Sequence, residues 1–264
     1  MDLGVLNNHA KKIDDFDRTF YQVKPVSGIS KEPAPGVHNI VSCFGNNELG
    51  KKETELCAVG SGEGEQRLWQ CICPSAESYR QELKEYILNL SKQEVAGIHL
   101  DCIGLPGPSY CSCSRCQKLW QESGLTWEIW RCKTVTDFIG EVKSILPDTM
   151  PLSLSLYPDP VHPERFGLDL KSLEQYADFF LVPLYDMTYK SPYWMEVLAN
   201  AFRRRLTKPL YVEIYMKGPK EKDLLAAVQA VAAHADGLVF AYDTKLSREL
   251  LPQIKMAIEN ARTL

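Results

Sequence analysis

The sequence predicts an α/β protein of the (β/α)8 TIM-barrel class, folded as one domain over residues 1–264. Short runs of β-branched and other apolar residues alternate with amphipathic helical segments from about residue 75 onward, which is typical of α/β folds. The later runs begin about 25 to 30 residues apart, the length of a strand together with its returning helix. The chain length of 264 residues also matches the roughly 250 residues of a typical barrel.

Eight strands can be placed along the chain from this pattern. The first is ambiguous, because residues 1–8 or residues 20–29 could supply it, and the sequence leaves open that this strand is degenerate. Two short runs follow at residues 38–45 and 68–74. The remaining five are buried apolar runs, at residues 95–101, 151–158, 177–186, 209–215 and 236–243. An open doubly wound sheet is the alternative architecture, although its usual G-x-G-x-x-G nucleotide-binding turn follows no early strand.

Composition and charge limit the classes of partner. Hydrophobic residues make up 45% and charged residues 24% of the chain, which excludes a disordered or fibrous protein. A net charge of −4 offers no basic surface for a polyphosphate backbone, so we expect no nucleic-acid partner. No apolar stretch approaches the ~20 residues that cross a bilayer, and the N-terminal residues lack the pattern of a secretory signal. These features predict a soluble, cytoplasmic protein without a membrane partner, and they leave its oligomeric state open.

Polar residues gather where the predicted strands end. Because the active site of a (β/α)8 barrel lies at the C-terminal ends of its strands, these residues are the candidate functional set. A carboxylate inside an apolar strand is costly unless it is paired or used, which singles out Asp101 and Glu213. Asp186 and Asp243 also follow strands, and helix capping is the structural alternative for both. The candidate substrate contacts are His99, Tyr157, Tyr185, Tyr215 and Asp243.

Two carboxyl groups that face one another across a polar, aromatic-lined mouth are what glycosidic cleavage requires. One protonates the leaving oxygen, and the other attacks the anomeric carbon or activates water. We predict Glu213 as the acid/base and Asp101 as the nucleophile, with Asp186 as a reserve candidate for either role. Tyrosines suit such a site, since ring faces stack on sugar C–H surfaces and hydroxyls bond to hydroxyls. The expected partner is therefore a carbohydrate.

A Cys-rich insertion at about residues 102–125 predicts a metal site. Its three thiols lie within six residues and are Cys111, Cys113 and Cys116. Thiolates this close together in a reduced protein suggest a soft metal, and Zn²⁺ normally takes four ligands in a closed structural site. Cys73, at the end of the predicted third strand, is the first choice for the fourth ligand, while Cys71 and Cys102 remain open. The alternative is that the three thiols are ordinary surface residues.

The same segments resemble a known group of proteins. The order CPSAESYRQELKEYILNL, VAGIHLDCIGLPG, YCSCSRC and FFLVPLYDMTY is similar to that of the hypothetical glycosyl-hydrolase-like barrels, over roughly residues 65–245. The cysteine loop also resembles that of the family 42 β-galactosidases, in which a similar triplet and an earlier cysteine hold zinc. The resemblance implies a (β/α)8 barrel that acts on glycosides, with Asp101 and Glu213 as its carboxylate pair.

Three functions of different classes are compatible with these residues. The leading hypothesis is a glycoside hydrolase. The second is a non-catalytic carbohydrate-binding barrel with a structural zinc site, since the fourth strand ends in Leu100-Asp101 where the β-galactosidase clan usually has Asn-Glu. The third, a metal-dependent hydrolase, has the least support, because the chain has five histidines and no H-x-H or H-E-x-x-H pair. No organic cofactor is expected.

Overall fold

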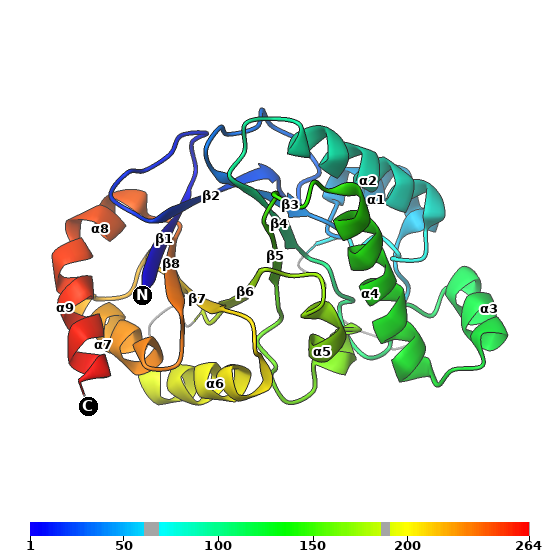
Figure 1. Cartoon of the computed structure of the whole chain (residues 1–264). Helices are drawn as coiled ribbons and strands as arrows, with labels where there is room; N and C mark the ends of the chain where they lie inside the picture. The colour runs from blue at the N-terminus through cyan, green and yellow to red at the C-terminus, as the bar shows by residue number, and fades with distance from the viewer. Residues whose placement is uncertain (61–68, 186–190, 264) are drawn as a thin grey trace.

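The chain folds into a closed barrel of parallel strands, which confirms the predicted (β/α)8 class. The computed structural model describes residues 1–60, 69–185 and 191–263. Each strand pairs with the next along the chain, and β8 returns to pair with β1 (Figure 1). The strands are β1 (Asp2–Asn7), β2 (Arg18–Lys24), β3 (His38–Ser42), β4 (Gly97–Asp101), β5 (Leu152–Ser155), β6 (Phe179–Pro183), β7 (Leu210–Tyr215) and β8 (Gly237–Ala241). Closure through the β1–β8 pair excludes the open doubly wound sheet.

The N-terminal part of the barrel corrects two sequence predictions. Both ambiguous runs are strands, and β1 is not degenerate, because it pairs in parallel with β2 on one side and β8 on the other. The strand expected at 68–74 is not part of the barrel. Its described residues instead take part in two single antiparallel bridges, Gly45 with Cys71 and Cys57 with Ile72. Residues 71–74 are as buried as a strand, so periodicity could not distinguish this segment from one.

Helices cover the outside of the barrel from β3 onward. They are α1 (Asn47–Lys52), α2 (Glu77–Ser91), α3 (Ser114–Ser123), α4 (Trp127–Ile145), α5 (Leu170–Leu173), α6 (Pro192–Arg205), α7 (Glu221–Ala232), α8 (Thr244–Glu249) and α9 (Leu251–Arg262), with short 3₁₀ turns η1 (Thr54–Leu56) and η2 (Pro163–Phe166). The connections after β1 and β2, residues 8–17 and 25–37, are loops. Among the described residues, no helix combines the length and the apolar character needed to cross a bilayer.

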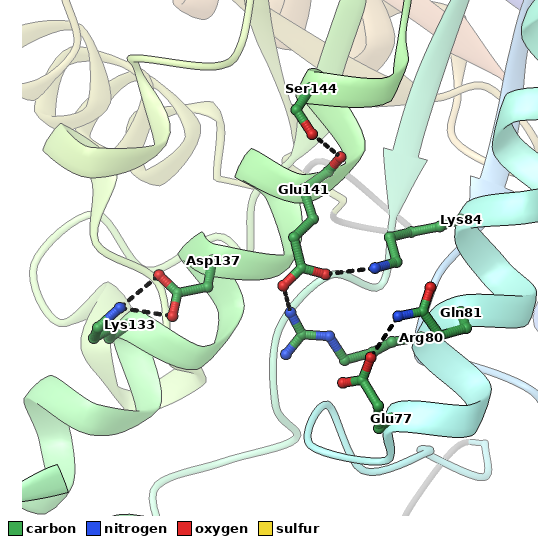
Figure 2. Close-up of polar contacts among 8 residues, drawn as sticks. All are labelled: Glu77, Arg80, Gln81, Lys84, Lys133, Asp137, Glu141 and Ser144. Carbon is green, nitrogen blue, oxygen red and sulfur yellow. Dashed lines mark hydrogen bonds and ion pairs between the residues drawn. The ribbon is translucent and has the colours of Figure 1, made fainter.

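Ion pairs join α2 to α4. Glu141 of α4 lies between Arg80 and Lys84 of α2 and accepts a hydrogen bond from each (Figure 2). The distance from Lys84 Nζ to Glu141 Oε2 is 2.9 Å. These contacts tie together the helices that precede and follow the Cys-rich insertion, whose own helix α3 projects beyond α4 (Figure 1).

The inside of the barrel has its own apolar core. Its buried members are Leu6, Phe20, Ile40, Phe179, Leu181, Tyr211, Val239 and Ala241. A larger cluster includes the outward-facing strand residues and the buried faces of the helices. Close packing inside the barrel requires a glycine at Gly237, because a Cβ there would lie 2.2 Å from the Tyr211 ring. Beyond this core, toward the C-terminal ends of β4 and β7, lie Asp101 and Glu213.

Candidate functional site

A cavity of about 740 Å³ opens at the C-terminal end of the barrel. Asp101, which ends β4, and Glu213, on β7, both line it. The two strands are separated by β5 and β6 in the barrel, yet the charge of Asp101 acts on Glu213. The cavity volume falls in the range of about 300–1,000 Å³ that is usual for small-ligand sites. The structure therefore brings the predicted carboxylate pair together over one shared space.

Glu213 is a buried carboxyl group whose pKa suits a proton donor. The residue is 8% exposed. Burial raises the pKa of Glu213 to about 7, and the neighbouring charge of Asp101 acts in the same direction. The Tyr185 hydroxyl donates a hydrogen bond to Glu213 Oε1 and opposes this rise in pKa, because the bond stabilises the ionised carboxylate. Near neutral pH, Glu213 can thus both give up and take back a proton.

Asp101 is oriented by the backbone that follows it. The Cys102 N–H donates to Asp101 Oδ1 at 2.8 Å. Cys102 itself has a φ of 50°, a left-handed conformation that is uncommon for residues other than glycine. Burial raises the pKa of Asp101 above its usual value, although the hydrogen bonds from Cys102 and the nearby Ser155 hydroxyl act in the opposite direction. The site therefore holds donors that stabilise the ionised form of Asp101.

His99 lies two residues before Asp101 on β4 and is 1% exposed. Its Nδ1 is 2.8 Å from Ser153 Oγ, and its Nε2 is 2.8 Å from Ser155 Oγ. Burial lowers the pKa of His99 to about 3, and the nearby His38 adds to the effect. The imidazole is therefore neutral near pH 7, and both of its ring nitrogens have partners.

Aromatic rings surround the mouth of the cavity. Tyr185, Tyr215 and Tyr242 form a triangle with ring centroids 5.2 to 5.9 Å apart. Tyr242 has a φ of 73°, a strained conformation that recurs at functional sites when the surrounding structure enforces it. Tyr157 also lines the cavity and stacks on Phe166, with ring centroids 4.4 Å apart. Ring faces and hydroxyls of this kind can contact a sugar.

Of the other two predicted acids, the structure describes only Asp243, which does not line this cavity. The Asp243 carboxylate caps α8 and accepts from the Leu246 N–H at 2.9 Å, as in the helix-capping alternative. Asp243 lines a second cavity of about 880 Å³, which shares Tyr242 with the first. Asp186 lies outside the described residues.

Several residues that line the cavity were missed by sequence reasoning. Trp194, in the first turn of α6, lines the cavity and is nevertheless 61% exposed. Cys102 donates to Asp101, and Ser155 lines the cavity beside them. The alternation of Ser153 and Ser155 along β5 was a usable signal for Ser155, since both point into the barrel. Nothing in the local sequence indicated Trp194.

A second candidate site is a four-cysteine cluster beside the barrel. Its members are Cys73, Cys111, Cys113 and Cys116, whose sulfur atoms all lie within 4.8 Å of one another without a disulfide. The Cys73 sulfur is 3.3 Å from that of Cys116 and 3.8 Å from that of Cys113. Cys73 lies in the extended segment between β3 and α2, and not at a strand end as expected. Cys71 and Cys102, the other candidates for the fourth position, are outside the cluster.

The geometry of the four-cysteine cluster fits a metal ion. Four sulfurs arranged tetrahedrally at ~2.3 Å from a zinc ion would be about 3.8 Å apart, close to the separations found here. Hydrogen bonds among the four thiols lower the pKa of Cys111 and Cys113 and raise the pKa of Cys73 and Cys116. The Val59 N–H donates to Cys111 Sγ at 3.3 Å, a contact that stabilises a thiolate.

Comparisons with known proteins support the fold. No protein-family model matches the chain, and no curated protein matches its sequence. A chitinase from Rhizomucor miehei has a TM-score of 0.59 and 11% identity, over 99% of this chain and 100% of the other. The glycoside hydrolase domain of PelA from Pseudomonas aeruginosa has a TM-score of 0.54 and 14% identity, over 91% of this chain and 94% of the other.

A third similar structure is Ega3 from Aspergillus fumigatus, solved in complex with galactosamine. Its TM-score is 0.50 at 11% identity, over 91% of this chain and 89% of the other. At identities this low, the likeness shows the barrel fold alone. The structural neighbours of the chain thus include glycoside hydrolases built on the same barrel.

Proposed function

We propose that the protein is a glycoside hydrolase that cleaves its substrate at the C-terminal mouth of the barrel. The observation that carries the proposal is the meeting of Asp101 and Glu213 over one cavity. Glycosidic cleavage needs two such carboxyl groups on opposite sides of the bond that breaks. The chitinase and the PelA domain, which share the fold, are consistent with this reading.

In the proposed reaction the two groups have different roles. Glu213 transfers its proton to the glycosidic oxygen while that oxygen leaves C1, and an oxygen of the ionised Asp101 forms a bond to C1. Water then attacks C1, gives a proton to Glu213 and releases Asp101 as the carboxylate. The pKa of about 7 at Glu213 suits a group that donates a proton in one step and accepts one in the next.

The cavity wall supports a carbohydrate that carries no acidic group. Among the described residues, neither lysine nor arginine lines this cavity. A sugar carboxylate or sulfate would therefore meet Asp101 and Glu213 without a compensating cation. The rings of Tyr157, Tyr242 and Trp194 provide faces on which a sugar ring can pack. Galactosamine bound to Ega3 shows that a protein of this fold takes a sugar ligand.

The direct test is release of nitrophenol from a panel of neutral nitrophenyl glycosides. Wild-type protein should turn over at least one of them, and Asp101→Asn should abolish that turnover. Asp137→Asn is the matched control, since Asp137 lies on α4 and pairs with Lys133 outside the cavity (Figure 2). Sugar binding by the wild type without release of product from any glycoside would instead support the non-catalytic carbohydrate-binding barrel.

We also propose that the four-cysteine cluster holds Zn²⁺ as a structural clamp. All four positions around the ion would be protein sulfurs, so no position is left for a substrate. The clamp would connect the segment between β3 and α2, through Cys73, to the loop after β4. The resemblance of this loop to that of the family 42 β-galactosidases remains a prediction.

Metal analysis and thermal unfolding test the clamp. The purified protein should contain one zinc per chain, and chelation should lower Tm. Cys116→Ser should lose the metal, whereas Cys132→Ser should retain it, because Cys132 is a buried residue of α4 outside the cluster. Turnover that is lost on chelation and restored by metal at an unchanged Tm would indicate a catalytic ion instead.

A further inference from the structure

We propose that the leaving part of the substrate, its aglycone, is an apolar alkyl or aryl group that binds in an apolar wing of the cavity. The inference rests on the proposed function and names the substrate class of that same site. The apolar wing is the side of the cavity lined by Leu156, Leu184, Trp194, Met195 and Leu198. The expected substrates are therefore neutral glycosides of apolar alcohols.

The apolar wing extends the cavity from the barrel interior into the layer between the strands and the helices. Leu6 and Leu181, which also line the cavity, belong to the apolar core inside the barrel. Leu156, Leu184 and Met195 belong instead to the larger cluster that the strands share with the helices. One cavity therefore joins a polar centre at the two carboxyl groups to an apolar space beside α6.

Two strand ends and one helix build the apolar wing. Leu156 directly follows β5, and Leu184 directly follows the neighbouring strand β6. The other three side chains come from the first two turns of α6, which packs against β7. Leu198 lies four residues after Trp194 and three after Met195, a spacing that places all three on one face of the helix.

The apolar wing is closed on the inside and open at one end. Leu156, Leu184 and Met195 are buried, so its inner walls are already packed. Leu198 is half-buried, and Trp194 is the most exposed of the five side chains. A ligand in the apolar wing would therefore meet preformed apolar walls and could reach solvent beside Trp194.

The side chains of the apolar wing favour an apolar ligand over a second sugar unit. None of the five has a hydroxyl, amide or charged group, and the Trp194 indole N–H is their one possible donor. The hydroxyls of a sugar placed there would lose hydrogen bonds to water and regain few of them, which is unfavourable. An alkyl or aryl group has no such hydrogen bonds to lose, and removal of its surface from water favours binding.

The apolar wing lies on the side of the proposed acid. The Leu184 N–H donates to the backbone carbonyl of Glu213 at 3.2 Å, and the hydroxyl of the next residue, Tyr185, donates to Glu213 Oε1. In the proposed reaction Glu213 protonates the glycosidic oxygen as that oxygen leaves C1, so the group attached to this oxygen lies beside Glu213. The aglycone then departs as a neutral alcohol, for which an apolar wall is suited.

Binding of simple alcohols tests the apolar wing without turnover. Wild-type protein is titrated with 1-butanol, 1-hexanol and 1-octanol, and the Trp194 indole N–H is followed by NMR. Affinity should rise about fourfold for each added methylene, which corresponds to about 0.8 kcal/mol. Comparison of benzyl alcohol with 1-hexanol shows whether the apolar wing prefers an aryl or an alkyl group, and either preference supports the proposal. Affinity that does not change with chain length, or binding that leaves the Trp194 signal in place, would overturn it.

Substitutions on α6 test the position of the bound alcohol. Leu198→Asn introduces an amide of similar size and should weaken 1-octanol binding by about tenfold. Leu198→Met keeps an apolar side chain of similar volume and should bind nearly as the wild type does. Val197→Asn is the matched control, since Val197 is the adjacent residue of α6 and does not line the cavity. Equal affinities in Leu198→Asn and Val197→Asn would contradict the proposal. Should Leu198→Asn not fold, the wild-type titrations still decide the question.

Turnover separates this inference from the proposed function. For a sugar that the protein releases from its nitrophenyl glycoside, kcat/KM should rise from the methyl to the butyl to the octyl glycoside, whose leaving alcohols have nearly the same acidity. If no glycoside is cleaved but alcohols bind beside Trp194 as expected, the proposed function fails and the apolar binding site stands. If glycosides are cleaved with no gain from methyl to octyl, and alcohols do not bind, the inference about the aglycone fails alone.

Discussion

The two ends of the barrel contain the same kinds of residue in opposite electrostatic settings. At the N-terminal end, Tyr211 donates a hydrogen bond to Asp2 at 2.6 Å, much as Tyr185 donates to Glu213 at the mouth. The two carboxyl groups differ in burial, since Glu213 is 8% exposed and the Asp2 side chain 45%, and in the presence of Arg18, whose Nη2 is 3.1 Å from the Asp2 carboxylate. The hydrogen bond from Tyr211, together with Arg18, lowers the pKa of Asp2, whereas burial raises the pKa of Glu213 to about 7.

This contrast shows how burial and a neighbouring cation together decide what a tyrosine-bound carboxylate can do. Paired with Arg18, Asp2 stays ionised and contributes to stability. Glu213 is buried and has no cation beside it among the described residues, so it can gain and lose its proton near neutral pH, which suits acid/base catalysis. In (β/α)8 barrels the N-terminal end generally serves stability and the C-terminal end serves catalysis, and the placement of Arg18 agrees with that division.

The largest expected effect comes from removing one carboxylate at each end. Glu213→Gln should lower kcat on a cleaved glycoside by about 10²–10⁴-fold, the usual contribution of a general acid/base. Asp2→Asn should leave kcat unchanged and lower the free energy of unfolding. Steady-state kinetics and urea unfolding measure the two effects. Equal losses of kcat in both variants would remove the functional difference between the two ends.

The next effect is on stability at low pH. The pKa of His38, at the N-terminal end, is lowered from 6.5 to about 4 by burial and by the charge of Arg18. Between these two values the unfolded chain binds more protons than the folded one. The contribution of His38 to the free energy of unfolding is therefore fully present above about pH 6.5 and is lost as the pH falls through about 4. A shift of this size corresponds to about 3 kcal/mol.

Urea unfolding between pH 4 and pH 7 measures this contribution. His38→Gln retains an acceptor for Arg18, which lies 3.3 Å from His38 Nε2, but cannot titrate. We expect the free energy of unfolding to depend less on pH in His38→Gln than in the wild type. The part of the pH dependence that comes from His99 should remain in the variant. An identical dependence in both proteins would contradict the assignment to His38.

Removing the cation itself should have a smaller effect. Arg18→Leu takes away hydrogen bonds to Asp2 and Tyr211 and a contact with the Phe179 ring, 5.1 Å from the guanidinium carbon. The Asp2 side chain is 45% exposed, so water screens the ion pair. We expect a loss of about 1–2 kcal/mol in the free energy of unfolding. Turnover at the opposite end should be unaffected, and a large fall in kcat would show that the two ends are coupled.

The smallest expected effect is a displacement of the pH profile. The Tyr185 hydroxyl holds the pKa of Glu213 below the value that burial alone would impose. Tyr185→Phe should therefore raise this pKa and move the basic limb of the pH profile of kcat/KM to higher pH. Tyr211→Phe is the matched control at the N-terminal end and should leave the profile in place. A basic limb that moves to lower pH in Tyr185→Phe would contradict the role given to this hydrogen bond.

The strands that the sequence located correctly are those with a strong local signal. β4 and β7 are short, almost wholly buried runs with helices at the expected spacing. The error at residues 68–74 arose because Cys71, Ile72 and Cys73 are as buried as any strand residue, although they form only isolated bridges or none. Backbone pairing is a tertiary property, so no count of apolar residues could have exposed this error.

In the candidate site, too, some residues could be identified from local sequence and others only from the tertiary structure. Asp101 and Glu213 could be selected locally, because a carboxylate inside an apolar strand is unusual. Trp194 could not, since its first-turn position on α6 has no meaning until the helix is placed beside the mouth. Asp243 has a local role that the sequence offered as an alternative, the cap of α8.

The amino-acid sequence by itself determined the class of fold and the residues with unusual chemistry, because strand and helix periodicity and the presence of acids or thiols in apolar runs are local properties. Only the tertiary structure decided which of these residues meet. Barrel closure brings Asp101 and Glu213 to one cavity and folds Cys73 against the later triplet. It also placed Arg18 at the opposite end. Arg18 therefore pairs with Asp2 and not with Glu213. This pairing helps to distinguish a carboxylate that stabilises the fold from one that exchanges its proton, since electrostatic interactions depend on distance in space and not on distance along the chain.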